Sequence, residues 1–426
     1  MTPEVKKRIE QIRQGIVPEG YVKDKDGIYP RDWASKKIGQ WLKLAERSIV
    51  LQDEEEYQLV TIRRGFGGVD SRGSFLGKNV LVKNYFIVKT GDFIISKRQI
   101  AHGACGIVPP DLDGAVVSNE YNVFLPQDGT NIQMFNLMMQ LPHYKRLFYL
   151  MSDGVHIEKL LFKTQDWMKR TLAMPLLKEQ KKIAEILSTQ DKAIELQGRK
   201  IEELKRFKKG CLEKMFPKKG QKVPEKRFPG FTDDWEQRKL TEFVEFFSGL
   251  TYTPNDVQEN GTLVLRSSNV SNGEVVDADN VYVNPQVVNS ENVKVGDIVV
   301  VVRNGSRSLI GKHAQIKTFM PNTVIGAFMT GIRSECPKFT NALLNTSRFE
   351  EEIAMNMGAT INQITGYMFS KMEFKVPCLD EQKEIGEYFE NLDHLITLHQ
   401  RKLDEMKKQK KALMQLLLTG IVRVRL

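Results

Sequence analysis

The sequence contains little cysteine. Its 426 residues include only Cys105, Cys211, Cys336 and Cys378, which are scattered without a CxxC pair or neighbouring paired histidines. Structural zinc sites and disulfide frameworks depend on closely spaced ligands or cysteines, so neither is indicated. Reduced thiols in a reducing compartment are the simplest interpretation.

Long hydrophobic runs are also missing. Ile298–Val302 is an apolar run of strand length, far below the roughly 20 residues that a membrane-spanning helix needs. Residues 1–15 are charged and lack the apolar core of a signal peptide. We therefore expect a soluble, cytoplasmic protein with no membrane partner.

Matches to catalytic motifs are incomplete. Residues 284–287, NPQV, fail at the third and fourth positions of the Asn-Pro-Pro-aromatic loop of an adenine methyltransferase, and residues 305–312 have one residue too many for a P-loop. Asp380, Glu381 and Lys383 imitate a nuclease cluster, but they fall in the first turn of an expected helix, where negative charge favours the helix dipole. We expect no catalytic residue, no metal site and no cofactor on this chain.

The charge balance is basic. Lys and Arg number 63 against 53 Asp and Glu, which gives a formal net charge of +10 at pH 7. Such a balance suits a polyanionic partner, with nucleic acid ahead of an anionic membrane surface. The length allows two or three domains.

The chain contains an internal repeat. Residues 175–183, PLLKEQKKI, match residues 377–385, PCLDEQKEI, and the match continues without a gap to about residues 217 and 419. At the same offset of 202 positions (377 minus 175), Asp32-Trp33 matches Asp234-Trp235. Gly91-Asp92 recurs, slightly shifted, as Gly296-Asp297. A fixed offset over the whole chain indicates two copies of one unit.

The two matched segments, 175–217 and 377–420, are expected to be long helices. Each begins near a proline and has a glutamate in its first turn and lysines toward its end. Apolar residues recur in alternating steps of four and three, which is typical of a coiled coil. The seam consists of Ile183, Leu187, Ile194, Ile201 and Leu204 in the first helix and Ile385, Phe389, Leu392, Ile396, Leu403 and Met406 in the second.

Two polar residues interrupt this seam at equivalent positions, Gln197 and His399. We interpret them as setting the helix register, not as catalytic groups. Two similar helices in one chain can pair antiparallel, related by a pseudo-twofold axis. At 1.5 Å per residue each would be a rod of roughly 60 Å.

Residues 1–20 form an N-terminal arm that resembles a helix end followed by a linker, without the helix. The C-terminal helix, with its tail at 421–426, is a candidate for the missing partner. In that case the two ends of the chain lie close together.

The segments between these elements differ from each other. Residues 21–174, and residues 218–376 including their linker, alternate short β-rich runs with Gly, Asn and Asp turns and a few short helices. The predicted fold class is α+β, with two mixed α/β domains separated by two long antiparallel coiled-coil helices in a pseudo-twofold internal repeat. A duplicated frame with divergent inserts suits a protein that reads two different targets.

Glycine-flanked loops of these segments contain the residue types that bind DNA. Arg can grip guanine and Asn or Gln adenine, whereas Lys and Ser more often contact phosphate. The basic linker around residues 218–227 is expected to be solvated instead. The candidate DNA-binding residues are Arg63, Arg64, Ser71, Arg72, Lys97, Arg98, Gln99 and His102 in the first segment, and Arg266, Ser268, Asn269, Arg303, Asn304, Ser306, Arg307, Lys312, Asn362 and Gln363 in the second.

The repeated helix starts, the segment VPEKRFPGFTDDWEQRKL and the Gly-Asp turns together resemble the specificity subunits of type I restriction-modification systems. The resemblance spans essentially the whole chain. It implies that each variable segment is a target recognition domain reading one half of a split site in double-stranded DNA, and that the helices set the spacer between the halves.

The resemblance also implies partners. Two modification subunits would dock on the helices with S-adenosylmethionine, and two restriction subunits would add ATP- and Mg-dependent translocation and cleavage. This chain would be a non-catalytic recognition subunit. The alternative from another class is a coiled-coil assembly scaffold without sequence-specific DNA binding.

Overall fold

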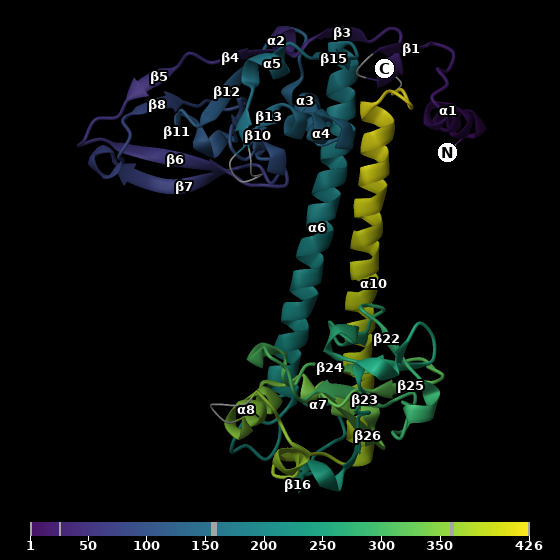
Figure 1. The fold of residues 1–426 in the computed structure, drawn as a ribbon. Helices are drawn as coiled ribbons and strands as arrows, with labels where there is room; N and C mark the ends of the chain where they lie inside the picture. The colour runs from purple at the N-terminus through teal and green to yellow at the C-terminus, as the bar shows by residue number, and fades with distance from the viewer. Residues whose placement is uncertain (1, 25–26, 155–159, 358–361, 425–426) are drawn as a thin grey trace. The chain divides into compact units, whose positions relative to one another are not determined.

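The computed structural model describes residues 2–24, 27–154, 160–357 and 362–424. The chain divides into two compact units, which we describe separately (Figure 1). Unit 1 comprises residues 1–196 and 403–426, and unit 2 comprises residues 197–402. The long helices α6, Leu177–Met215, and α10, Leu379–Leu418, each contribute one part to each unit.

Unit 1 contains two principal sheets. One has the strand order β10-β9-β12-β4 with antiparallel neighbours, and the other has the order β5-β8-β11-β6-β7, in which β11 and β6 are parallel. The helices are α1 Pro3–Arg13, α2 Ile38–Trp41, α3 Ile132–Met139, α4 Pro142–Leu150 and α5 Thr164–Met168. The strands are β1 Tyr21–Asp24, β2 Gly27–Pro30, β3 Ala34–Lys37, β4 Leu42–Leu44, β5 Ser48–Val50, β6 Glu56–Ile62, β7 Val69–Leu76, β8 Asn84–Ile87, β9 Phe93–Ser96, β10 Cys105–Ile107, β11 Val116–Ser118, β12 Tyr121–Pro126, β13 Ser152–Asp153, β14 Leu161–Phe162 and β15 Thr171–Met174.

The core of unit 1 is built around Trp167. Its ring packs against those of Phe124, Phe135, Phe148 and Phe162, with centroids 5.6 to 6.3 Å apart. Such aromatic contacts join α3, α4 and α5 to the first sheet. Buried leucines and isoleucines of α6 and α10 complete the same core.

Unit 2 also has two principal sheets, ordered β17-β26-β23-β24 and β18-β22-β19-β25. Its core includes Phe216, Trp235, Phe339 and Phe389. The helices are α7 Pro337–Leu344, α8 Ser347–Asn356 and α9 Gly366–Phe369. The strands are β16 Glu236–Lys239, β17 Val244–Ser248, β18 Val257–Gln258, β19 Thr262–Leu265, β20 Val270–Ser271, β21 Glu274–Val275, β22 Val281–Val283, β23 Ile298–Val301, β24 His313–Gln315, β25 Thr323–Ile325, β26 Met329–Ser334 and β27 Glu373–Val376.

The repeat of the sequence is a repeat of the fold. The two-stranded sheet β3·β15 recurs 202 positions later as β16·β27, with Ala34 opposite Met174 in one and Glu236 opposite Val376 in the other. The antiparallel sheets also correspond strand for strand, β10-β9-β12-β4 to β24-β23-β26-β17. The second sheets share a central order, β11-β6-β7 in unit 1 and β25-β19-β22 in unit 2, each with one parallel pair, but they differ in their outer strands and in size. The mixed α/β duplication predicted from the sequence is therefore confirmed, with divergence concentrated in one sheet.

The Gly-Asp pairs are structural turns. Gly91 and Gly296 have φ angles of 86° and 96°, a left-handed conformation that suits glycine. Asp92 and Asp297 are buried, and each accepts a hydrogen bond from the backbone N–H three residues earlier, at 2.7 and 2.8 Å. Each carboxylate also pairs with an arginine of its own unit. The Asp–Arg ion pairs therefore stabilise the turn before the second strand of each antiparallel sheet, β9 or β23.

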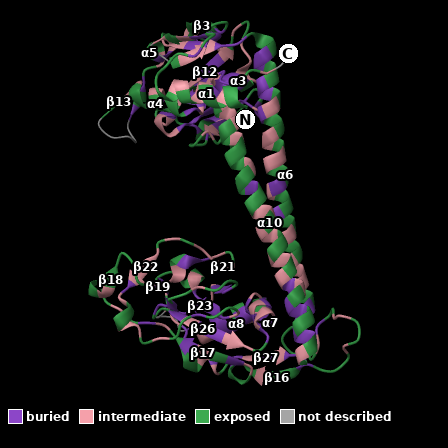
Figure 2. Cartoon of the chain, turned by 90° about the vertical axis from the view of Figure 1, so that its right-hand side faces the viewer, coloured by how far each residue is buried: buried purple, intermediate pink, exposed green. Residues whose placement is uncertain are grey.

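Within each unit, α6 and α10 run antiparallel and side by side (Figure 2). In unit 1 the Asp191 carboxylate lies 2.5 Å from Lys410, and in unit 2 the Asp393 carboxylate lies 2.6 Å from Lys208. Positions 191 and 393, and 208 and 410, are each 202 apart, so the two ion pairs are equivalents with the helices exchanged. All the predicted seam residues are buried or half-buried.

The polar residues of the seam contact each other. The side-chain amide of Gln197 donates to the backbone carbonyl of His399 at 2.9 Å, and it lies 2.8 Å from the His399 ring nitrogen Nδ1. The pair satisfies groups that a coiled-coil seam would otherwise bury without partners. It therefore favours a single register of the two helices in unit 2.

The N-terminal arm and the start of β1 lie against the residues that follow α10 in unit 1. The Tyr21 hydroxyl donates to the Gly420 carbonyl at 2.6 Å, and the Arg8 guanidinium donates to the Ile421 carbonyl. The proximity of the arm and the C-terminal tail inferred from the repeat is thus confirmed. No helix in the described residues combines the length and apolar character of a membrane span.

Candidate DNA interface

In unit 1 the structure brings the two groups of candidate residues together. The turn that follows β6 hydrogen-bonds to the turn that follows β9: Gly65 N–H donates to the His102 carbonyl, and Phe66 N–H to the Gly103 carbonyl, both at 2.8 Å. Gly103 has a φ of 75°, and a Cβ there would overlap the Phe66 ring. Residues 63–64 and 97–102 therefore belong to one surface.

Some of these arginines already have acidic partners. The Arg63 and Arg98 guanidiniums lie 2.5 and 2.7 Å from the carboxylates of Asp70 and Glu120, and all four side chains are substantially exposed. Exposed ion pairs contribute little stability, so a phosphate or a base can displace the carboxylate at small cost. Ser71 and Arg72 are exposed on β7, the edge strand of the second sheet. Lys97, Gln99 and His102 are half-buried.

In unit 2 three separate groups of candidates meet. The Asn304 side-chain amide donates to the Ser267 hydroxyl at 3.1 Å. Arg303 forms an isolated antiparallel bridge with Gln363, and the Asn362 amide donates to the Gly305 carbonyl at 3.1 Å. Loops near residues 267, 304 and 362, far apart in the sequence, thus form one polar surface. Ser268, Ser306 and Arg307 are exposed there, and Lys312 is half-buried at the neighbouring turn.

Asn269 has a different role from the one expected. It is 1% exposed, and its side-chain oxygen accepts from the Arg266 N–H at 2.9 Å. Its amide donates to the Ala278 carbonyl and the Asn280 side chain, both at 2.8 Å. The side chain is consumed in closing a loop and does not face a base. Arg266 remains half-exposed but pairs with Asp279 at 2.8 Å.

An exposed aromatic residue at this surface escapes sequence reasoning. Phe328 is 57% exposed, and the Arg303 guanidinium carbon lies 5.1 Å from the centroid of its ring. The sequence gives little indication that this residue is exposed, because an aromatic residue between two β-rich runs is usually interpreted as part of the core. The three-residue spacing between β25 and β26, which places it in a tight turn, is the only local cue.

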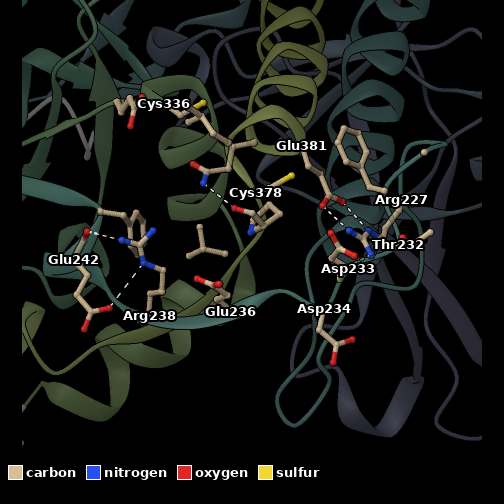
Figure 3. Close-up of a pocket in the computed structure, with 18 residues that line it drawn as sticks. Arg227, Thr232, Asp233, Asp234, Glu236, Arg238, Glu242, Cys336, Cys378 and Glu381 are labelled. Atoms are coloured by element: carbon tan, nitrogen blue, oxygen red, sulfur yellow. Dashed lines mark hydrogen bonds and ion pairs between the residues drawn. The ribbon is translucent and has the colours of Figure 1, made fainter.

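Arg227 corrects the expectation that the whole basic linker is solvated. Its side chain is 13% exposed, and its Nε and Nη2 donate to the two oxygens of Glu381 at 2.8 and 2.6 Å (Figure 3). Glu381 is 1% exposed and also accepts from the indole N–H of Trp235 at 3.1 Å. We call these three residues the unit 2 clasp. The hydrogen bonds that Arg227 donates to Glu381 raise the pKa of Arg227.

Unit 1 contains a corresponding arrangement, the unit 1 clasp, made of Arg423, Glu179 and Asp32. Arg423 donates to both oxygens of Glu179, at 2.7 and 2.6 Å, and to both oxygens of Asp32, at 2.8 and 2.9 Å. These bonds lower the pKa of Asp32 and raise that of Arg423. Glu179 and Glu381 are 202 positions apart, so both helices begin at a buried glutamate that is neutralised by an arginine from the end of a linker or tail.

The remaining titratable groups have structural surroundings. His313 is buried, with Nδ1 2.9 Å from the Gly311 carbonyl and Nε2 3.0 Å from the Asn345 amide. Burial lowers the pKa of His313, and Lys208 adds to this effect while Asp393 opposes it. In the part of the chain that the structure describes, no three His, Cys, Asp or Glu side chains form a group that could hold a metal ion.

The two units are similar, and each presents a polar loop surface on the same frame. Comparison with known families matches the type I restriction modification DNA specificity domain twice, over residues 30–206 and 232–408. The two ranges are displaced by 202 positions (232 minus 30), the offset of the repeat. The chain therefore belongs to this family and carries two copies of its domain.

Its relatives agree. The chain is 25% identical over 422 residues to the type I restriction enzyme MjaVIII specificity subunit of Methanocaldococcus jannaschii, covering 93% of this chain and 94% of the relative. It is 26% identical over 204 residues to the EcoKI specificity subunit of Escherichia coli K12, covering 46% and 44%. Its fold is similar to that of the type I restriction-modification S subunit from M. genitalium, with a TM-score of 0.56 and 14% identity over 90% of this chain and 96% of that one.

Proposed function

We propose that this chain directs a type I restriction-modification complex to a bipartite site in double-stranded DNA. Unit 1 reads one half of the site and unit 2 reads the other. The observation that carries the proposal is the combination of equivalent antiparallel sheets with different second sheets and different polar loops. A shared frame with divergent readers is what recognition of an asymmetric site requires.

The candidate DNA-binding surfaces of the two units differ in structure. In unit 1 the loop surface adjoins the edge strand β7, whose Ser71 and Arg72 are exposed. In unit 2 it consists of loops joined by side-chain hydrogen bonds, such as that between Asn304 and Ser267. Arginine and amide side chains can read base edges in the major groove, while lysine and serine position the backbone. The two half-sites are therefore expected to differ in sequence.

The chain is proposed to act without chemistry of its own, in the cytoplasm. Two modification subunits would supply S-adenosylmethionine-dependent methylation of flipped adenines, and two restriction subunits ATP, Mg and cleavage. No cofactor is assigned to this chain. Two observations support this division. The chain belongs to a specificity-domain family. The buried acids Glu179 and Glu381 are each paired with an arginine of a clasp.

The long helices are proposed to set the spacer between the half-sites. α6 has 39 residues and α10 has 40, and each passes from one unit into the other. The ion pairs Asp191–Lys410 and Lys208–Asp393 fix their register within each unit. A change in length must be made in both helices to keep these pairs aligned.

The test is a map of N6-methyladenine across the genome of cells that contain this chain with its neighbouring modification subunit, against cells lacking the chain. A split motif present only with the chain would establish the addressing role. Inserting one matched heptad into α6 and α10 should then lengthen the spacer and leave both half-sites unchanged. Identical maps with and without the chain, beside an active modification subunit, would favour the assembly-scaffold alternative.

A further inference from the structure

The turn that carries Phe328 is held by several backbone hydrogen bonds. Ala327 N–H donates to the Leu250 carbonyl at 2.9 Å, and Met329 N–H closes the turn on the Gly326 carbonyl at 2.8 Å. The N–H groups of residues 302 and 303 both donate to the Phe328 carbonyl, at 3.0 and 3.2 Å. The backbone that carries this aromatic ring is therefore held in place before any partner binds.

The same turn is tied to the loops of the candidate surface. Gly326 N–H donates to the carbonyl of Leu265, the residue before Arg266, at 2.9 Å. Arg303, bonded to the Phe328 carbonyl, forms the bridge with Gln363. An exposed aromatic ring on a hydrogen-bonded turn thus lies where the three polar loops of unit 2 come together.

Arg303 differs in its partner from three other arginines of the candidate interface. Arg63, Arg98 and Arg266 each lie within ion-pair distance of a carboxylate. Among the residues that the structure describes, Arg303 has no such carboxylate, and its guanidinium lies over the Phe328 ring instead. An aromatic face orients a guanidinium but leaves its N–H groups at the edge free to donate.

We propose that Phe328 is a positioning residue for Arg303, and that the two form a single guanine-reading element in unit 2. The ring restricts the rotamers of the arginine, so less entropy is lost when the guanidinium donates two hydrogen bonds to guanine O6 and N7. This inference rests on the proposed function and adds to it a specific base class and a specific residue pair.

The experiment compares methylation maps of the wild-type chain with those of Phe328→Ala, Phe328→Tyr and Arg303→Ala, each with its modification subunit. A cation–π contact at an exposed site corresponds to about 2–5-fold in an equilibrium constant. Phe328→Ala should therefore relax discrimination about 2–5-fold at one G·C position of one half-site. Arg303→Ala should relax the same position further, and Phe328→Tyr, which keeps the aromatic face, should retain wild-type discrimination.

Two controls separate positioning from loss of folding. Phe319→Ala removes another phenylalanine of unit 2, 79% exposed in a loop outside the candidate surface, and should change nothing. The half-site read by unit 1 is an internal reference and should keep its sequence in every variant. Damage to the fold of unit 2 would instead reduce discrimination at every position of its half-site together.

The outcomes are distinct. Relaxation at one shared position by Phe328→Ala and Arg303→Ala, with Phe328→Tyr unaffected, supports the pairing. Unchanged specificity in Phe328→Ala, relaxation at different positions, uniform weakening, or failure of Phe328→Tyr overturns it while leaving the bipartite function standing. Absence of a split motif with the wild-type chain would reject the proposed function itself.

Discussion

Replacing Arg227 by methionine should destabilise unit 2 strongly, although the residue lies in a linker. The substitution leaves the Glu381 carboxylate, 1% exposed, with the Trp235 indole as its remaining side-chain partner in the clasp. Removing one partner of a buried ion pair costs about 3–5 kcal/mol. The Trp235 hydrogen bond and the helix N-terminus stabilise the remaining charge, so we expect a loss of about 3 kcal/mol.

The matched control is Lys222→Met in the same linker. The Lys222 ammonium lies 3.0 Å from Asp234, but the two side chains are 73% and 60% exposed. Exposed pairs contribute at most about 1 kcal/mol. The double variant Arg227→Met with Glu381→Met removes both charges and should cost less than Arg227→Met alone.

Hydrogen exchange of the intact chain in increasing denaturant is the appropriate assay, because it reports each unit separately. Peptides from unit 2 should open at lower denaturant in the Arg227 variant, while peptides from the unit 1 core around Trp167 serve as the internal reference. Equal destabilisation by Lys222→Met and Arg227→Met, or a double variant worse than the single one, would refute the reasoning.

Three further predictions concern unit 2. Burial lowers the pKa of His313, so below pH 6.5 the unfolded chain binds protons more readily than the folded chain does. The free energy of unfolding, measured from pH 7.5 down to 5.5, should therefore fall by up to about 1.4 kcal/mol per pH unit, and His313→Gln should reduce this fall. A Cβ at Gly331 would overlap the ring of its cross-strand partner Phe247, so Gly331→Ala should lower the midpoint of unit 2 unfolding in urea by the equivalent of about 1–3 kcal/mol. Replacing Gln197 by leucine leaves the polar groups of His399 without this partner, and crosslinking of cysteine pairs along the helices should then reveal a second register.

Much of the architecture was predictable because it is periodic. The offset of 202 positions identified the duplication, and heptad spacing identified the two helices and their seam. Strand order was not predictable, since the short runs of β6 or β19 do not specify which neighbour they pair with, and nothing in them distinguishes the parallel pairing of β19 with β25.

The site shows the same limits. Residue type and loop position were sufficient to propose Arg303 and Asn304. They misled at Asn269, because an asparagine that closes a loop has the same local sequence as one that reads a base. Arg227 and Phe328 depend on contacts across 154 and 25 positions respectively, with Glu381 and Arg303, and no local pattern records such contacts.

The division of the chain has a consequence for biosynthesis. Unit 2 is one continuous segment, whereas the core of unit 1 includes Leu417 and Leu418 of α10 beside Ile183 and Leu187 of α6. At ribosomal rates of about 5–20 residues per second, the 221 positions between residues 196 and 417 take about 10–45 s to synthesise. During that time the apolar face of α6 in unit 1 stays uncovered while unit 2 can already fold. The unit made first on the ribosome is thus the last to be completed, and its unfinished core is the natural substrate for a chaperone.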